Sequence, residues 1–366
     1  MIPYKKIAIK DIGDVVTGKT PPTANADYYD GEYMFISPTE LHGGYAITKS
    51  EKTITKAGMK SVKSNSIKGT SVLVGCIGWD MGNVAMCFEE CATNQQINAI
   101  TNIKSDYNPY YIYYWLSGKK EYLFSIASVT RTPILSKGTF EDVEVPLPPK
   151  PYQDKVVDVL LRIDKKIEKN KQINDNLQQM AYAKYMHMFF GKKPNAKLGD
   201  IIIENPKSTI QVGDAKDIDG KIPFFTSGDA ILRWPDTLVS GRNCYLNTGG
   251  NAGVKFYVGN AAYSTDTWCI SARDNLSDYL YMLLESIKPE LNQKFFQGTG
   301  LKHLQKPLLK DRPIYIPELS ELNEFNNDIM PWLTMISENT RESEELVSLR
   351  DWLLPMIMNG QATISD

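Results

Sequence analysis

The chain has 366 residues, of which 42% are hydrophobic and 23% are charged, as is typical of a soluble globular protein with room for two domains. Its net charge of −2 does not by itself indicate a nucleic-acid-binding protein, and the absence of any run of about 18 apolar residues argues against a membrane span. The N-terminus lacks the apolar core of a signal peptide, and the five scattered cysteines indicate reduced thiols, so we expect a cytoplasmic protein without a zinc site.

Residues 1–150 are expected to form a mainly β domain with short helices. Segments 33–37 and 71–74 are rich in strand-forming residues and are bounded by Gly and Pro. Asn108-Pro109 precedes an apolar segment that predicts a short helix. The same Asn-Pro pair resembles part of the Asn-Pro-Pro-Tyr motif of adenine methyltransferases. The second Pro and a Gly-rich cofactor turn are missing, so we interpret it as a helix start.

A basic segment lies within this domain, between Thr48 and Thr70. It holds a single acidic residue, Glu51, and six lysines among Ser and Thr: Lys49, Lys52, Lys56, Lys60, Lys63 and Lys68. This pattern suits contact with the phosphates of a polyanion, and a solvated surface without a ligand is the alternative.

Several Gly- and Thr-rich turns of the same domain are candidate contact loops. Gly18-Lys19-Thr20 resembles the end of a phosphate-cradling loop, but the leading Gly of that motif is absent, which argues against a nucleotide site. Amide and hydroxyl side chains are common readers of base edges. The candidate contacts outside the basic segment are Lys19, Thr20, Trp79, Gln95, Arg131 and Lys137.

A long helix is expected to follow over residues 151–193. Four Pro within residues 146–151 mark the exit from the first domain. The helical pattern from Gln153 to Phe190 would be roughly 57 Å long, more than a compact domain requires. Residues 151–193 carry nine basic and five acidic residues, a net charge of +4.

Residues 194–318 repeat the order of the first domain. Segments 222–226, 253–257 and 276–286 resemble the first strand, the segment 83–87 and the short helix of the first domain, and residues 264–267 occupy the place of residues 94–96. The candidate contacts of this second domain are Thr226, Arg233, Asn251, Thr265, Lys302 and His303.

A second long helix is expected over residues 319–366, beginning or kinking near Pro331. Residues 318–366 carry two basic and ten acidic residues, a net charge of −8, and the apolar positions of the two helices, up to Met180 in the first and Leu349 in the second, share one phase. Opposite charge and matched phase favour pairing. Three polar residues, Asn170, Asn174 and Asn339, lie near the apolar seam, where such residues often set the register.

An internal repeat unites these elements. At an offset of 169 residues, Pro148 matches Pro317, Asn170 matches Asn339, and Gly191 matches Gly360. We therefore predict an α+β protein with two similar, mainly β or mixed domains (1–150 and 194–318). Two long helices (151–193 and 319–366) separate them, packed as an antiparallel coiled coil with pseudo-two-fold symmetry.

In its arrangement the chain resembles the specificity subunits of type I restriction–modification systems. The segments that carry the resemblance are Ile12–Asp14, Thr17–Pro21, Phe35–Leu41, Val145–Pro149 with Tyr152-Gln153, Ile163–Glu168 and Leu353–Gly360. The second domain departs from the pattern, since it lacks the Gly-Lys-Thr-Pro turn and a Gln after its Pro exit.

The resemblance implies two target recognition domains that insert loops into the major groove of double-stranded DNA, with the helices as a rigid spacer. The chain would read a bipartite site without catalysis of its own and without a cofactor. Its partners would be methyltransferase subunits, which use S-adenosylmethionine, and restriction or translocase subunits, which use ATP and Mg²⁺. Two alternatives stay open: a non-catalytic repeat scaffold that assembles protein partners without DNA, and a divergent methyltransferase.

Overall fold

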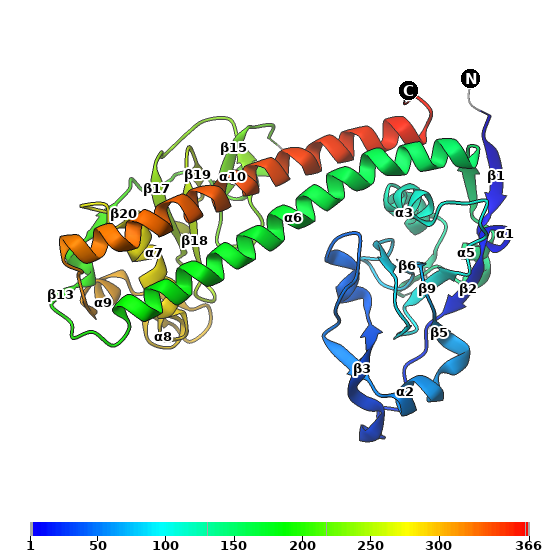
Figure 1. Cartoon of the computed structure of the whole chain (residues 1–366), viewed down its shortest axis with the longest axis horizontal. Helices are drawn as coiled ribbons and strands as arrows, with labels where there is room; N and C mark the ends of the chain where they lie inside the picture. The colour runs from blue at the N-terminus through cyan, green and yellow to red at the C-terminus, as the bar shows by residue number, and fades with distance from the viewer. Residues whose placement is uncertain (1–2, 130, 217, 363, 365–366) are drawn as a thin grey trace. The chain divides into compact units, whose positions relative to one another are not determined.

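The computed structural model describes residues 3–129, 131–216, 218–362 and 364. The chain divides into two compact units: unit 1 (Met1–Lys166 with Glu345–Asp366) and unit 2 (Ile167–Glu344). Two 40-residue helices, α6 (Lys150–Phe189) and α10 (Leu319–Met358), each contribute to both units (Figure 1). Within the described ranges, no helix is long and apolar enough to cross a membrane.

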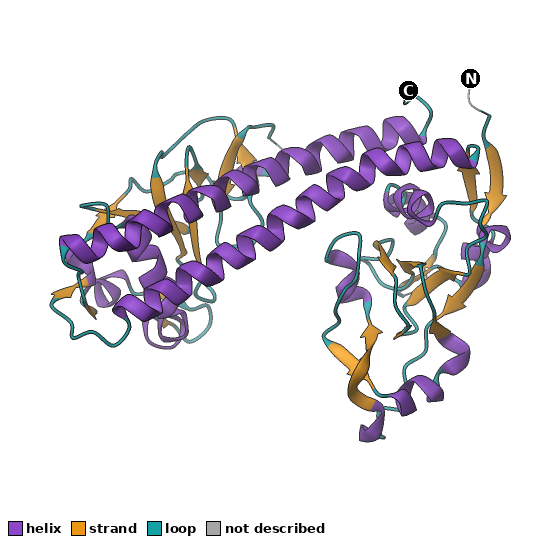
Figure 2. Ribbon diagram, viewed as in Figure 1, coloured by secondary structure: helices purple, strands orange, loops and turns teal. Residues whose placement is uncertain are grey.

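Unit 1 combines short strands with short helices (Figure 2). Its strands are β1 (Lys5–Ala8), β2 (Asp14–Thr17), β3 (Tyr29–Ile36), β4 (Lys52–Ile54), β5 (Ser66–Ile67), β6 (Ser71–Gly75), β7 (Val84–Cys87), β8 (Cys91–Thr93), β9 (Ile97–Thr101), β10 (Ser128–Val129), β11 (Pro133–Ile134) and β12 (Glu144–Leu147). Its short helices are α1 (Ile9–Ile12), η1 (Ala26–Tyr28), η2 (Pro38–His42), α2 (Lys56–Ser61), η3 (Lys63–Asn65), α3 (Pro109–Ser117), α4 (Lys120–Ser125) and α5 (Lys137–Glu141).

Unit 2 is built from the same kinds of element. Its strands are β13 (Ala196–Lys197), β14 (Ile202–Glu204), β15 (Ile222–Phe225), β16 (Leu232–Trp234), β17 (Arg242–Asn247), β18 (Val254–Val258), β19 (Ala262–Tyr263), β20 (Thr267–Ala272), β21 (Phe296–Gln297), β22 (His303–Leu304) and β23 (Pro313–Ile314). Its short helices are η4 (Leu198–Asp200), η5 (Gly213–Ala215), α7 (Ser277–Ser286), α8 (Lys288–Glu290), the π-helical η6 (Leu291–Phe295) and α9 (Lys306–Lys310).

The sheet topology of unit 1 recurs in unit 2. Each unit has a four-stranded antiparallel sheet, in the order β2-β9-β6-β7 in unit 1 and β14-β20-β17-β18 in unit 2. A parallel pair, β3 with β8 or β15 with β19, stands beside it in each unit. Two short antiparallel pairs also correspond: β1-β12 with β13-β23, and β10-β11 with β21-β22. The predicted repeat and the predicted α+β class are confirmed.

Local sequence explains the elements that carry the core. Strand β6 is buried on both faces, which its unbroken apolar run Val72-Leu73-Val74 requires. Helix α3 begins where predicted, because the Asn108 side chain accepts a hydrogen bond from the Tyr110 backbone N–H at 2.9 Å and Pro109 occupies the first turn.

Each unit completes its core with both long helices. In unit 1, Val156 and Leu160 of α6 share a buried cluster with Leu354 and Ile357 of α10. In unit 2, Phe189 of α6 packs edge-on against Phe325 of α10 and Tyr279 of α7, with ring centroids 5.2 Å apart in both pairs.

The antiparallel pairing of α6 with α10 is confirmed by their contacts. In unit 2, Lys184 pairs with Asp328, and Asn339 donates its side-chain N–H to the Asn174 amide oxygen at 2.9 Å. Asn170 is buried, and its amide donates to a Glu342 carboxylate oxygen at 2.7 Å. The predicted seam asparagines therefore bond across the helix pair, and a basic α6 side chain meets an acidic one of α10.

One of the two alternatives for the second helix, a start near Pro331, was wrong, and so was the placement of Met180 and Leu349 in the apolar seam. Helix α10 begins at Leu319 and continues through Pro331, because the buried side chains of Ile329 and Leu333 hold this stretch against the core despite the hydrogen bond that Pro removes. Met180 and Leu349 match each other in the repeat, but their side chains are 49% and 44% exposed and lie outside the apolar seam.

A buried ion pair links the long helices in unit 1. The Asp164 carboxylate of α6 accepts hydrogen bonds from Arg350 of α10 at 2.9 Å and from the Tyr114 hydroxyl of α3 at 2.6 Å. The Asp164 side chain is 4% exposed. The repeat places the apolar pair Leu333 and Ala181 at the corresponding positions of unit 2, so this polar contact is particular to unit 1.

Replacing Arg350 with Met should destabilise the protein strongly, because Asp164 would stay buried without its cation. We expect the free energy of unfolding in urea to fall by about 3–5 kcal/mol. Removal of the exposed Arg162–Asp158 pair by Arg162→Met is the control, with an expected loss under about 1 kcal/mol. The double variant Asp164→Leu/Arg350→Met should recover most of the loss, and a loss for Arg350→Met as small as the control's would contradict this account.

Candidate nucleic-acid interface

Two predicted contact residues of unit 1, far apart in sequence, meet at the end of its four-stranded sheet. The Thr20 hydroxyl donates a hydrogen bond to the Gln95 side-chain oxygen at 2.9 Å. Gly18 makes the approach possible, because a Cβ at this position would lie 2.1 Å from the Asn94 carbonyl oxygen. The turn after β2 and the turn between β8 and β9 therefore form one surface.

Two further loops of unit 1 join this surface. The Cys76 N–H donates to the Gln96 carbonyl at 2.7 Å, and the Gly78 N–H donates to the Pro133 carbonyl at 3.0 Å. These bonds place the loop that carries Trp79 beside the β10-β11 hairpin that carries Arg131. We call residues 18–20, 76–79, 94–96, 128–129 and 131–134 the unit 1 loop cluster.

Unit 2 joins counterparts of three of these loops, together with the turn that follows β15. The Thr248 N–H donates to the Asp266 carbonyl at 3.0 Å, and the Gly250 N–H donates to the Lys302 carbonyl at 2.9 Å. The Ser227 hydroxyl also donates to the Asp266 carbonyl, at 2.5 Å. We call residues 226–228, 247–251, 264–267 and 298–303 the unit 2 loop cluster, which contains Thr226, Asn251, Thr265, Lys302 and His303.

The side chains on these clusters suit contact with a polar, anionic partner. Lys19, Arg131 and Lys302 are exposed, and no carboxylate of the described residues forms an ion pair with any of them. Gln95, Asn251 and His303 are exposed as well. Trp79 and Leu301 stand out as apolar side chains, 70% and 65% exposed.

The basic segment forms a second surface beside the unit 1 loop cluster. All six predicted lysines, from Lys49 to Lys68, are exposed along β4, α2, η3 and the turns around them. The Asn65 amide donates to the Thr17 carbonyl at 2.9 Å, which attaches the segment to the end of β2. Lys68 pairs with Glu90 at 3.4 Å.

Three further predicted contact residues also have partners within the protein. Thr226 is buried, and its hydroxyl accepts the Gly228 N–H at 3.0 Å. Arg233 on β16 pairs with Glu344 of α10 at 3.0 Å. Lys137 lies in the first turn of α5 and pairs with Glu141 at 3.5 Å. Their role in binding stays a prediction.

Lys255, which was not among the predicted functional residues, supports the unit 2 loop cluster through its backbone. Its ammonium group donates to the carbonyls of Thr226, at 2.7 Å, and Gly228. Burial lowers the pKa of Lys255 below its ordinary value. A lysine within the otherwise apolar strand segment Val254–Val258 was the available signal.

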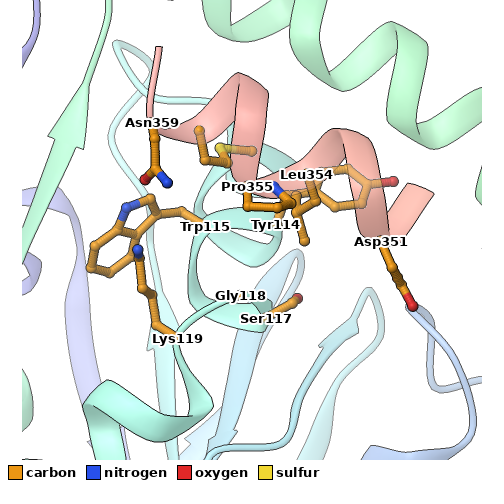
Figure 3. Close-up of a pocket in the computed structure, with 10 residues that line it drawn as sticks. Tyr114, Trp115, Ser117, Gly118, Lys119, Asp351, Leu354, Pro355 and Asn359 are labelled. Atoms are coloured by element: carbon orange, nitrogen blue, oxygen red, sulfur yellow. The ribbon is translucent and has the colours of Figure 1, made fainter. Parts of the chain in front are cut away.

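A cavity of about 360 Å³ in unit 1 is lined by residues outside the unit 1 loop cluster. Figure 3 shows Tyr114 and Trp115 of α3 beside the last turns of α10, which carry Leu354 and Pro355, with Lys119 next to the Trp115 ring. Asp351 pairs with Arg350 at 2.8 Å, and the lining offers no nucleophile with an adjacent base. In the described part of the chain, no three His, Cys, Asp or Glu residues are grouped to hold a metal ion, and the five cysteines are free and buried.

Comparison with known proteins gives concordant matches. A family model described as the type I restriction modification DNA specificity domain matches residues 1–179 and again residues 193–346. The type I restriction enzyme MjaIX specificity subunit of Methanocaldococcus jannaschii is 25% identical over 412 residues, covering 98% of this chain and 93% of that protein. The HindI specificity subunit of Haemophilus influenzae is 30% identical over 177 residues, covering 46% and 38%. The S subunit of a type I restriction-modification system from M. genitalium has a similar fold, with a TM-score of 0.66 at 14% identity over 96% of this chain and 95% of that one.

Replacing Gly18 with Ala should disrupt the unit 1 loop cluster, because the new methyl group would collide with backbone that the sheet holds in place. We expect a loss of about 1–3 kcal/mol in unfolding free energy, measured by urea denaturation. Gly138→Ala in α5 is the matched control, since a Cβ there meets nothing within 4 Å. Equal stabilities of the two variants would show that the turn does not depend on this close approach.

Proposed function

The chain belongs to the type I restriction modification DNA specificity family, and we propose that its two loop clusters each bind one half of a bipartite DNA site. As a member of this family it is a DNA-specificity subunit of a type I restriction–modification system and is not itself an enzyme. The resemblance that the sequence motifs indicated is confirmed.

The recurrence of one loop cluster in both units carries this proposal. Each cluster contains the loop that joins β6 to β7 or β17 to β18, the turn between β8 and β9 or between β19 and β20, and the short hairpin β10-β11 or β21-β22. The fourth segment differs, because it follows β2 in unit 1 and β15 in unit 2. Two similar but chemically different surfaces are what two different half-sites require. The side chains exposed on them include the amides and cations that recognise base edges.

The unit 1 loop cluster and the basic segment would have different roles in DNA binding. Arg131 and Gln95 lie on the loop cluster, where their donors and acceptors suit base edges in the major groove. The lysines of the basic segment are exposed, flexible cations that suit phosphates, which position a protein on DNA without reading its sequence. In unit 2, Asn251, Lys302 and His303 would be the base-contacting side chains, with Thr265 beside them.

The long helices would set the distance between the half-sites. Each of α6 and α10 has 40 residues, roughly 60 Å of helix at 1.5 Å per residue. Cross-helix bonds from Asn170 and Asn174 support a fixed register, because a slipped pairing would leave the buried Asn170 amide and the half-buried Asn174 amide without these partners. A fixed register would give a constant gap in the DNA site.

Methyltransferase subunits and restriction or translocase subunits are the proposed protein partners. The exposed side chains of Met180 and Leu349 occupy matching positions of the repeat, which would provide two similar docking points for two copies of a partner. S-adenosylmethionine, ATP and Mg²⁺ would be bound by those partners and not by this chain.

Selection of randomised duplex DNA by the co-purified complex of this chain with its methyltransferase partner tests the function. We expect a split motif with a constant gap, because two clusters on one chain would bind two half-sites at a set separation. Sequencing of the selected pool gives the result. An intact complex that enriches no motif would favour the protein scaffold over DNA recognition.

Arg131→Ala and the triple variant Lys56→Ala/Lys60→Ala/Lys63→Ala should weaken DNA binding in different ways. Removal of a guanine contact made by Arg131 should cost about 1–3 kcal/mol and relax one position of the selected motif. Removal of three phosphate contacts should weaken all sequences equally and reduce the salt dependence of binding. Affinity measured on matched and mismatched duplexes at several salt concentrations separates the two. Uniform weakening by Arg131→Ala would instead assign Arg131 to a phosphate.

A further inference from the structure

Three lysines of unit 2 gather around a buried tryptophan. The Nζ atom of Lys306 lies 4.8 Å from the centre of the Trp268 ring, and the Nζ atom of Lys310 lies 5.9 Å from the centre of the same ring. Both lysines belong to α9, and Trp268 of β20 is 3% exposed. Lys207 follows β14 and is near enough for its charge to act on Lys306. We call Lys207, Lys306 and Lys310 the unit 2 lysine cluster.

The positive charge of this cluster is only partly compensated. Glu204 of β14 pairs with Lys310 and accepts a hydrogen bond from the Trp268 indole N–H at 2.8 Å. Within the described residues, neither Lys306 nor Lys207 forms an ion pair. Burial lowers the pKa of Lys306 below its ordinary value, and the charges of Lys310 and Lys207 lower it as well. Because three cations beside one carboxylate repel one another, a bound anion would stabilise the cluster.

The internal repeat shows that this charge is particular to unit 2. At the offset of 169 residues, Lys306 matches Lys137, but Lys310 matches Glu141. Lys137 and Glu141 form an ion pair at 3.5 Å within α5, so the corresponding helix of unit 1 compensates its own charge. Helix α9 has Lys at both positions. Unit 2 therefore carries positive charge where unit 1 carries an ion pair.

The unit 2 lysine cluster adjoins the unit 2 loop cluster through two segments of the chain. Lys306 stands three residues after His303, where the β21-β22 hairpin leads into α9. The Thr265 N–H donates to the Ile210 carbonyl at 2.9 Å, which attaches the segment that follows Lys207 to the turn between β19 and β20. An anion held by the lysines would therefore adjoin the surface proposed to contact DNA.

We propose that Lys306, together with Lys207 and Lys310, binds a phosphate group of the DNA backbone beside the half-site that unit 2 contacts. The inference rests on the proposed function and deepens it, because it assigns a phosphate contact to unit 2. A lysine ammonium group has three donors and no acceptor, which suits phosphate oxygens and carries no information about base sequence. One such site offers fewer phosphate contacts than the six lysines of the basic segment offer in unit 1.

Binding of the complex to its selected duplex at several salt concentrations tests this inference. Lys306→Met keeps the apolar stem over the Trp268 ring and removes the charge. We expect this variant to weaken binding to all sequences alike, with a loss about 3.5-fold larger at 50 mM than at 200 mM salt, because one phosphate contact changes the slope of log affinity against log salt by about 0.9. Lys306→Arg should retain the slope. The stability of Lys306→Met in urea should not fall, because the substitution removes repulsion between cations.

A duplex with one uncharged methylphosphonate linkage locates the contact. The linkage is placed at each position around the unit 2 half-site in turn. It should weaken binding of the unchanged complex most at the contacted phosphate, and Lys306→Met should abolish that effect, as expected when both changes remove the same contact. Losses that are additive at every position would show that the cluster holds a free phosphate ion or no anion, and would overturn the inference.

Lys197→Met is the matched control, because Lys197 is an exposed lysine of unit 2 that pairs with Asp311 at 2.9 Å. This variant should leave the salt slope unchanged. Equal slopes for Lys306→Met and Lys197→Met, in a complex that still selects its split motif, would overturn the inference while leaving DNA recognition intact. Loss of the methyltransferase partner from the Lys306→Met complex would also overturn it, by assigning the lysines to an acidic segment of that partner. A complex that selects no duplex would overturn the proposed function itself.

Discussion

Burial of apolar surface between α6 and α10 is the constraint on which both units depend. Neither unit has a closed core without side chains from both helices, as Val156 with Leu354 shows in unit 1 and Phe189 with Phe325 shows in unit 2. The chain must therefore complete its last helix before the first unit is fully packed. This explains why α10 stays helical through Pro331, because a break there would expose Ile329 and Leu333 of unit 2.

Because the helices and sheets form the core, the side chains of the connecting loops are available for binding. In both units the loops are joined to one another mainly by backbone hydrogen bonds, such as Gly250 to Lys302 and Gly78 to Pro133. Backbone bonds of this kind hold a loop's path while leaving its side chains available. The same frame can therefore present different side chains in the two units, which suits the proposed recognition of two half-sites.

The sequence was sufficient for the parts of this structure that depend on local pattern. The short helix after Asn108, the buried strand at Val72–Val74 and the antiparallel pairing of oppositely charged helices follow from capping, periodicity and charge. It could not show which loop side chains meet across long distances in sequence. The Thr20–Gln95 hydrogen bond and the supporting role of Lys255 depend on how separate strands end beside one another. Met180 looked like a seam residue because helical phase locates a face only approximately, and the structure turns it outward.

The two units differ in the charge that they would offer to DNA. In unit 1, β4 pairs with β3 and lies within the run of exposed lysines. In unit 2, β16 pairs with β15 at the corresponding edge, but residues 227–241 contain only one basic residue, Arg233, against two acidic ones. Arg233 is paired with Glu344, so its charge is already compensated.

Because non-specific affinity for DNA comes mainly from phosphate contacts, unit 1 would supply most of this affinity. Unit 2 would then depend mainly on base contacts from its own loop cluster and on phosphate contacts made by partner subunits, and this division reconciles a net charge of −2 with DNA recognition.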